Sequence, residues 1–284
     1  MNSSLFDDKE RILDRIRTTL GQMSVNYRHC LDTIADQNRK GARWRAAAVL
    51  LPLYFKPAGE SGNRHDEVVL QLIKRSAAVT QGGDISAPGG MLSPRIDGFL
   101  KSLLMLGVIP ALRGGARRNV REKGPREYSA VALFLANALR ESWEEIHLNP
   151  CNVEFLGALP TQNLILFTRT IFPLVGKVKR QWAFRPNAEV DKVIEIPLHA
   201  FFNAENYGIY CIHSNTNGEE SYFESPCFIC PDEDGVEEIL WGATLRIVTQ
   251  FLEYTFDFQA PVAHATRMVK KTLYPEYMTG NGDR

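Results

Sequence analysis

Three glutamates close to one another are the residues of this sequence that could do chemistry. Glu141, Glu144 and Glu145 follow Arg140 in the segment ALRESWEEIHL (138–148). Spacings of three and four residues put the three carboxylates on one side of a helix, where each like-charged pair costs roughly 0.2–0.5 kcal/mol. A compensating positive charge is therefore expected. Carboxylate oxygens are the ligands that hard divalent cations such as Mg²⁺ prefer.

The acids lie in a segment that predicts a helix of about five turns over 128–148. One face of this helix is expected to pack against the core, at Val131, Leu135, Leu139, Ser142 and Ile146. At about 100° per residue, Glu141 and Glu145 flank that face, and Glu144 lies further round the same side. The edge of a packing face is where a cleft is expected.

The rest of the chain predicts a mixed α/β protein. Helices are expected over 5–20, 26–38, 97–109 and 239–256, and strands over 43–55, 67–76, 153–160, 163–178, 190–198 and 221–230. Residues 46–76 are expected to form a hairpin, and Gly208, Asn215 and residues 217–218 are expected in turns. This order favours an α/β/α sandwich with a mixed sheet. The predicted organisation is a helical extension (1–40), one domain (41–260) with an insertion at about 92–130, and a C-terminal tail (261–284).

Composition excludes several function classes. The 284 residues carry 33 Lys+Arg and 33 Asp+Glu, and this balance does not favour nucleic acid as a partner. No apolar run approaches the ~20 residues of a membrane span, so no membrane association is expected. Five cysteines, an odd number, favour reduced thiols and a cytoplasmic protein. Cys227 and Cys230 have no second ligand pair at zinc spacing and are interpreted as structural thiols.

The sequence resembles the Nudix hydrolases, whose box reads G-x5-E-x7-R-E-U-x-E-E-x-G-U, with U a bulky apolar residue. Residues 140–148 match its second half at Arg140, at all three glutamates and at Leu148, and Gly90 of SAPGG begins the first half. Roughly 36 additional residues separate the two halves. The resemblance implies a Nudix-like fold and metal-dependent hydrolysis of a pyrophosphate.

A narrower resemblance is to the coenzyme A pyrophosphatase branch of that family, over about residues 43–256. Segment 74–90 retains most of the residues that mark the branch: Arg75, Ser76, Gly83, Ile85, Pro88, Gly89 and Gly90. Segments 157–176, 186–198 and 239–248 also fit the branch in order. The implied partner is a small-molecule nucleoside diphosphate, foremost coenzyme A or an acyl derivative. Arg75, Ser76 and Gly89 are the implied substrate-binding residues.

The resemblance also assigns roles at the site. Glu141 and Glu145 are expected as direct ligands of Mg²⁺ or Mn²⁺, and Glu144 as a catalytic residue that binds through water or to a second metal. Arg140 is expected to hold the carboxylates in place. The carbonyl of Gly90 is a further candidate ligand. Glu189, in PNAEV, is a candidate ligand or general base.

The sequence departs from both patterns at named positions. The first glutamate of the box falls on Ala132, for which Glu127 is a candidate replacement, and the box glycine falls on His147. A left-handed helix end tolerates His at some cost, so the turn is expected to persist. In the coenzyme A segment, three residues of the branch are replaced, by Val79, Gln81 and Ala87. An ADP-ribose or NADH pyrophosphatase, and a nucleotide-binding module without activity, therefore remain as alternatives.

A cluster of six cations at 113–126 has three interpretations. The first is a flexible solvated loop. The second is a segment that closes over the site, where Arg117 and Arg118 bind a substrate phosphate. The same segment could also mediate self-association, as in a homodimer.

Overall fold

The structure is a computed structural model, and it describes residues 8–57, 67–164, 167–216, 219–231, 235–261 and 267–273. The chain divides into two compact units, which are described separately. Unit 1 comprises Met1–Val68 and Pro88–Arg185, and unit 2 comprises Val69–Ala87 and Pro186–Arg284. In the described ranges, no helix has the length and apolar character needed to span a membrane.

The sheet of unit 1 is built around β1 (Arg45–Lys56), whose interior is apolar and almost wholly buried. β1 pairs in parallel with β7 (Arg169–Val178) and antiparallel with β4 (Gly89–Met91). β7 also pairs antiparallel with β5 (Val153–Ala158) and with β6 (Gln162–Leu164). A strand buried on both faces requires a continuous apolar run, and AAAVLLPLYF supplies one. The expected mixed sheet and α/β class are confirmed.

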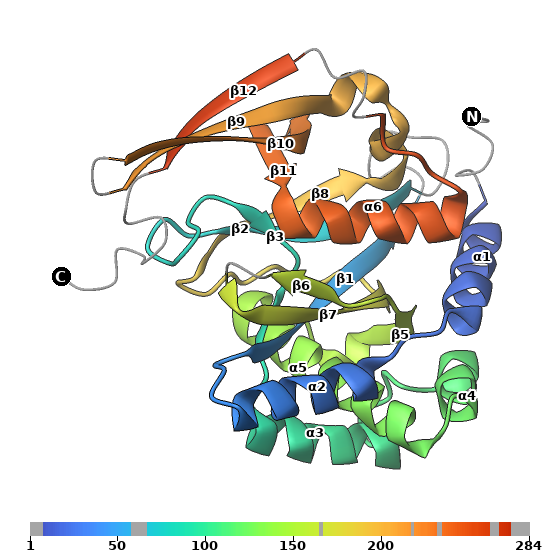
Figure 1. The fold of residues 1–284 in the computed structure, drawn as a ribbon. Coiled ribbons are helices and arrows are strands. Elements are labelled where there is room, and N and C mark those ends of the chain that lie inside the picture. The colour runs from blue at the N-terminus through green and yellow to red at the C-terminus, as the bar shows by residue number, and fades with distance from the viewer. Residues whose placement is uncertain are drawn as a thin grey trace. The chain divides into compact units, whose positions relative to one another are not determined.

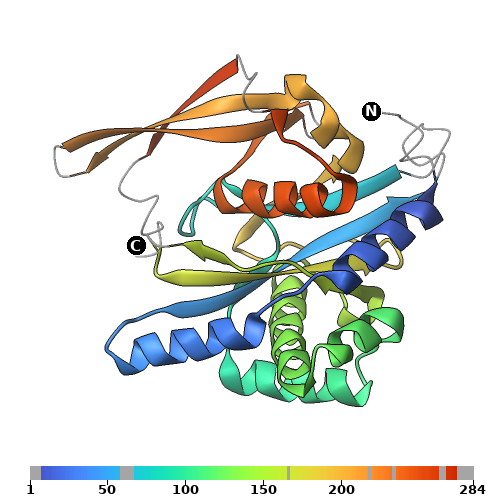
Figure 2. The same ribbon diagram turned by 45° about the vertical axis from the view of Figure 1, so that its right-hand side comes forward.

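Unit 1 also contains five α-helices in its described residues, which pack on the sheet or on one another: α1 (Lys9–Gln22), α2 (Tyr27–Arg39), α3 (Pro94–Leu106), α4 (Gly114–Glu122) and α5 (Pro125–Ile146). α5 packs on β1, β4 and β7, and both α2 and α3 pack on α5. Figures 1 and 2 show α2, α3 and α5 on the same side of β1 and β7. Tyr27 joins these layers, because its ring contacts Phe134 of α5 and Phe172 of β7 edge-to-face. The helices expected near 5–20, 26–38 and 128–148 are confirmed.

The flexible loop expected at 113–126 is wrong, because α4 occupies most of that segment. Its side chains make ordered contacts. Val120 is buried, Arg117 Nη2 donates to the carbonyl of Met105 at 2.8 Å, and the Arg121 guanidinium lies 5.3 Å from the ring centre of Tyr128. Long cationic side chains can cover neighbouring surface while keeping their charge in water, so a high density of charge is also compatible with a packed helix.

Unit 2 contains β2 (Glu67–Arg75) from Val69 onward, paired antiparallel with β3 (Ile85–Ser86) and β8 (Val190–Pro197). A second sheet has the order β11 (Glu237–Trp241), β10 (Glu219–Pro231), β9 (Tyr207–Thr216) and β12 (Arg267–Leu273). Helix α6 (Gly242–Phe256) packs on β10 and β11. Short 3-10 helices occur at Pro150–Asn152 in unit 1, and at Leu198–Phe202 and Ala204–Asn206 in unit 2.

Two local expectations in unit 2 are wrong. Gly208 and Asn215 lie inside β9 rather than in turns. Residues 239–241 pair with β10 as part of β11, and the helix begins only at Gly242, whose φ of +63° separates strand from helix. A strand that the sequence did not predict, β12, lies at 267–273 and runs parallel to β9. The turn expected at 217–218 and the tail from Tyr274 lie outside the described residues.

Candidate active site

The three glutamates of helix α5 differ in how far they are exposed to solvent. Glu145 is only 4% exposed, whereas the side chains of Glu141 and Glu144 are 16% and 50% exposed. The expected packing face is confirmed, since all five of its members are buried. Ser142 is compatible with this face because its hydroxyl donates to the carbonyl of Ala138 at 2.7 Å. Glu145 thus lies closest to the core, and Glu144 lies closest to solvent.

The end of α5 turns sharply at His147, as expected. His147 has φ of 56° and ψ of 31°, in the left-handed region. The N–H of His147 donates to the Trp143 carbonyl, and the N–H of Leu148 donates to the Ser142 carbonyl. This pair of bonds satisfies the last carbonyls of the helix in the way that glycine usually permits. The His147 ring also lies against Trp143, with Nδ1 3.0 Å from the carbonyl oxygen of Arg185.

The two glycines of SAPGG bring backbone directly against the carboxylates. The Gly89 N–H donates to Glu145 Oε2 at 2.9 Å. A Cβ at position 90 would lie 2.6 Å from Glu141 Oε1 and 2.7 Å from Oε2, and one at position 89 would lie 2.2 Å from the Ala48 carbonyl oxygen. A larger residue at position 89 would clash with the backbone of β1, and one at position 90 would have to displace the carboxylate of Glu141. The structure therefore unites Gly89 and Gly90 with Glu141 and Glu145.

Arg140 is the positive charge that compensates the glutamates. Its Nη2 donates to Glu141 Oε1 at 2.8 Å, and its Nη1 donates to Glu144 Oε2 at 2.9 Å. Burial of Arg140 opposes its charge, but the hydrogen bond that Arg140 donates to Asp97 and the charge of Glu141 outweigh that effect and raise the pKa of Arg140. Burial raises the pKa of Glu141, and Arg140 opposes that rise. Arg140 thus orients two of the three acids.

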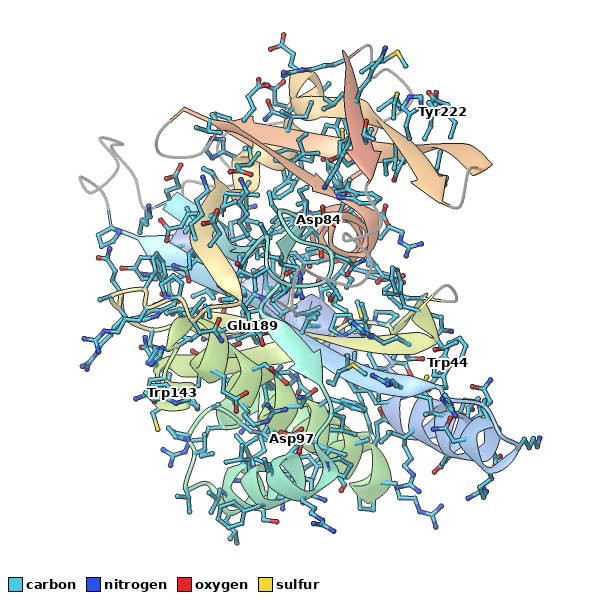
Figure 3. All side chains as sticks on the ribbon, turned by 90° about the vertical axis from the view of Figure 1, so that its left-hand side faces the viewer. Trp44, Asp84, Asp97, Trp143, Glu189 and Tyr222 are labelled. Atoms are coloured by element: carbon cyan, nitrogen blue, oxygen red, sulfur yellow. The ribbon has the colours of Figure 1, made fainter. Side chains whose placement is uncertain are left out.

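Asp97, on α3, is a member of the site that sequence reasoning missed (Figure 3). It is fully buried and accepts hydrogen bonds from Arg140 Nε at 2.8 Å and Nη2 at 3.3 Å. It also accepts from the N–H of Ser93 at 2.7 Å. An acid in the first turn of a helix is usually interpreted as interacting with the helix N-terminus. Nothing local indicates that its principal partner lies 43 residues away.

Asn137 is a second residue that the sequence did not reveal. Its Oδ1 accepts from the N–H of Ala48 at 2.9 Å, and its Nδ2 donates to the Met91 carbonyl at 3.1 Å. The same carbonyl accepts from Arg140 Nη2. Asn137 therefore links α5 to both β1 and β4 and fixes the position of Gly89–Met91 relative to the acids.

Three candidates of unit 1 lie away from the acids. Arg117 and Arg118 are on α4, and Arg117 binds near the C-terminal end of α3, whereas Asp97 is near its start. The neighbouring Arg121 contacts Tyr128, which is 13 residues before Glu141 and so about 20 Å along α5. The replacement of the missing box acid by Glu127 is wrong. Glu127 instead accepts from the N–H groups of Tyr27 and Arg28 at the start of α2, and Ala132 is fully buried.

Three further candidates, Arg75, Ser76 and Glu189, lie in unit 2. The N–H of Ser76 donates to the Glu189 carbonyl at 2.8 Å, so these two are neighbours through their backbones. Arg75 Nε donates to the Thr80 carbonyl at 3.0 Å, and the N–H of Glu189 donates to Asn187 Oδ1. Glu189 immediately precedes β8 (Figure 3). The role of these residues stays a prediction.

The donors at the acids fit a hard divalent cation in kind, since all are carboxylate or carbonyl oxygens. The described residues contain no group of three or more His, Cys, Asp or Glu side chains arranged to hold a metal ion. Arg140 takes one oxygen each of Glu141 and Glu144, and the Gly89 N–H takes one of Glu145. A cation binding here would share Glu141 and Glu144 with Arg140, either through the other oxygen of each carboxylate or by displacing the guanidinium.

Comparison with known proteins gave two similar curated sequences, both named Nudix hydrolase NudL and both uncharacterised. The protein from Pectobacterium atrosepticum is 29% identical over 118 residues, 41% of this chain and 56% of that protein. The protein from Photorhabdus laumondii is 25% identical over 222 residues, 78% of this chain and 87% of that protein. The chain thus spans just over half the length of the first relative. No family model matches the sequence.

Solved structures of Nudix proteins are also similar, at low levels. An Ap4A hydrolase from C. elegans is 14% identical with a TM-score of 0.33, over 55% of this chain and 81% of that one. A MutT/nudix family protein from Enterococcus faecalis is 10% identical with a TM-score of 0.40, over 90% of this chain and 79% of that one. Similarity of this degree assigns neither substrate nor mechanism. By sequence, the chain is similar to proteins named as Nudix hydrolases, and the resemblance indicated by its box residues is confirmed.

Proposed function

We propose that this chain is a pyrophosphohydrolase that cleaves the phosphoric anhydride of a nucleoside diphosphate linked to another group, using Mg²⁺ or Mn²⁺. The observation that supports this most is the enclosure of Glu141 and Glu145 against the backbone of Gly89 and Gly90. Buried carboxylates are costly unless they are paired or bind metal. A site that keeps two such carboxylates beside the backbone of two consecutive glycines is suited to hold a cation and a phosphate at close range.

Each residue of the site has a role in this proposal. Glu141 and Glu145 would hold the cation directly, with the Gly90 carbonyl as a further ligand, and Glu144 would hold it through water. When bound, a divalent cation neutralises diphosphate charge and makes an attacking water more acidic. Arg140, anchored by Asp97, positions Glu141 and Glu144. Asn137 fixes the strand that carries Gly90.

For the substrate we propose coenzyme A or an acyl derivative, cleaved to 3′,5′-ADP and a 4′-phosphopantetheine. The support is the resemblance of segment 74–90 and of the later segments to the coenzyme A branch. Within unit 2, the backbones of Ser76 and Glu189, which belong to two of these segments, are hydrogen-bonded. A dinucleotide such as NADH, or ADP-ribose, is the alternative substrate.

A nucleotide-binding module without activity is the second candidate function, and two observations favour it. The box acid is replaced by the buried Ala132, and Glu127 is committed to the start of α2. In addition, Arg140 already pairs with two of the three remaining acids. Such a module would gain thermal stability with nucleotide but release no product.

A product assay distinguishes these functions. The panel is coenzyme A, octanoyl-coenzyme A, ADP-ribose, NADH and diadenosine tetraphosphate, each with Mg²⁺, with Mn²⁺ and with EDTA. Metal-dependent release of 3′,5′-ADP is expected. Cleavage of another member would discard coenzyme A but retain the reaction. Stabilisation by nucleotide without product from any member would refute the hydrolase.

The variant Glu145→Gln tests the role of the buried acid. The amide keeps the shape of the side chain and can still accept from the Gly89 N–H, but it removes the negative charge that a cation needs. We expect kcat to fall about 100-fold or more, with the melting temperature nearly unchanged. The matched control is Glu253→Gln, at an exposed glutamate of α6. Near-full activity of Glu145→Gln would contradict the ligand assignment.

A further inference from the structure

An apolar cavity of about 320 Å³ lies between α3 and α5 of unit 1. Its lining includes Leu100 and Leu104 of α3, and Ala136, Leu139, Arg140 and Trp143 of α5. The volume is at the lower end of the roughly 300–1,000 Å³ found for small-molecule sites. Leu100 and Leu104 belong to the segment inserted between the two halves of the box, so the insertion creates this cavity.

The cavity is adjacent to the acids on the surface of α5. At about 100° per residue, Ala136, Leu139 and Trp143 all lie on one side of Arg140, and the three glutamates lie on its other side. Arg140 lines the cavity and also donates to Glu141 and Glu144. Trp143 is 45% exposed and stands at the outer surface of the helix (Figure 3). A molecule bound at the acids could therefore extend past Arg140 into the cavity.

The lining favours an aliphatic group over a nucleotide base. A base needs several hydrogen-bond partners along its edge, and the polar side-chain groups of the lining are few: Arg140, Asn149 and the indole N–H of Trp143. The Arg140 guanidinium binds Asp97 and two glutamates, and Oδ1 of the lining residue Asn149 accepts from the N–H of Cys151. The remaining lining side chains named above are apolar, and burial of an aliphatic chain against such surface is favourable.

We propose that this cavity, defined by Leu100, Leu104, Ala136, Leu139 and Trp143, binds an aliphatic acyl or alkyl group of the substrate while the diphosphate lies at the acids. The cavity would thus make the chain prefer acylated substrates over unacylated ones. This inference rests on the proposed function for the location of the diphosphate. The binding of an aliphatic chain can be measured independently of hydrolysis.

The first test is a titration with 1-octanol, a neutral aliphatic probe, followed by tryptophan fluorescence. Because Trp143 lines the cavity, we expect a saturable change in wild type that Trp143→Phe abolishes. Ala136→Leu, which fills part of the cavity, should weaken binding about tenfold. Leu100→Trp provides a second filling variant if Ala136→Leu lowers stability. Phe99→Ala, at a 64% exposed position on α3, is the control and should bind octanol as wild type does. No saturable change in wild type would overturn the proposal.

The second test compares kcat/KM for octanoyl-coenzyme A and acetyl-coenzyme A. We expect a ratio of about ten or more in wild type and in Phe99→Ala, and a ratio near one in Ala136→Leu. A ratio near one in wild type, despite octanol binding, would overturn the proposal. If neither compound is hydrolysed, the assignment of acyl-coenzyme A as substrate in the proposed function fails. The same fluorescence titration, with octanoyl-coenzyme A and acetyl-coenzyme A as ligands, then tests whether the cavity binds the acyl chain. Equal affinities for the two thioesters would overturn the cavity assignment.

Discussion

Arg140 explains how three glutamates can share one side of a helix. Its guanidinium bonds to Glu141 and Glu144 and is itself anchored by the buried carboxylate of Asp97. A planar guanidinium with several donors can serve three carboxylates at once, which a lysine ammonium cannot do with comparable geometry. The arrangement has a cost, because the partly buried charges are favourable only while the pairing is complete.

Asp97→Asn should be strongly destabilising for this reason. The amide keeps the shape but leaves Arg140, whose side chain is only 11% exposed, without its buried counter-charge. We expect the free energy of unfolding to fall by about 3 kcal/mol, at the lower end of values for broken buried pairs. Urea denaturation measures the change, with Asp191→Asn at an exposed aspartate as control. Equal stability of the two variants would show that Asp97 does not anchor Arg140.

At the scale of elements, α5 ends where the acids end, and His147 makes that possible. A non-glycine residue in the left-handed conformation costs on the order of 1 kcal/mol. Contacts with Trp143 and with the carbonyl of Arg185 offset part of this cost. The turn lets the chain leave the helix immediately after Glu145, so that Leu148 can be buried.

Two substitutions at position 147 separate strain from contact. His147→Ala loses the ring contacts and keeps the strain, whereas His147→Gly loses the contacts and relieves the strain. We therefore expect His147→Gly to be more stable than His147→Ala by about 1 kcal/mol. Chemical denaturation of the pair measures the difference, and each variant is the control for the other. Identical stabilities would indicate that the left-handed turn carries no strain.

Over the whole molecule, the sequence predicted what depends on local spacing. The 3.6-residue period predicted α5, its packing face and the placement of the acids, and glycine alone indicated a close backbone approach at 89–90. Interactions between distant residues were not predictable. Asp97 could not be assigned to Arg140, nor Glu127 to the start of α2, because the partners are 43 residues apart in the first pair and 100 in the second. α4 was missed because its charge density suggested a loop, and residues 239–241 of β11 because strand pairing overrode an apparently helical run.

The Arg140 network also predicts how the molecule responds to metal. Since Arg140 already compensates Glu141 and Glu144, the fold should not depend on a bound cation, and EDTA should leave the melting temperature unchanged while it abolishes hydrolysis. Excess Mg²⁺ should raise the melting temperature by a few degrees, because a ligand that binds only the native state stabilises it. Differential scanning fluorimetry with and without Mg²⁺ measures both effects.

Arg140→Lys provides the comparison for the metal response. Lysine keeps the charge but cannot bond to Asp97, Glu141 and Glu144 together, so the acids should be less well compensated. We expect a lower melting temperature without metal and a larger increase with Mg²⁺ than in wild type. An equal Mg²⁺ response in the two proteins would mean that Arg140 does not compete with the cation for these carboxylates. A wild-type protein that unfolds with EDTA would mean that the site depends on metal for its organisation, rather than being organised in advance by Arg140 and Asp97.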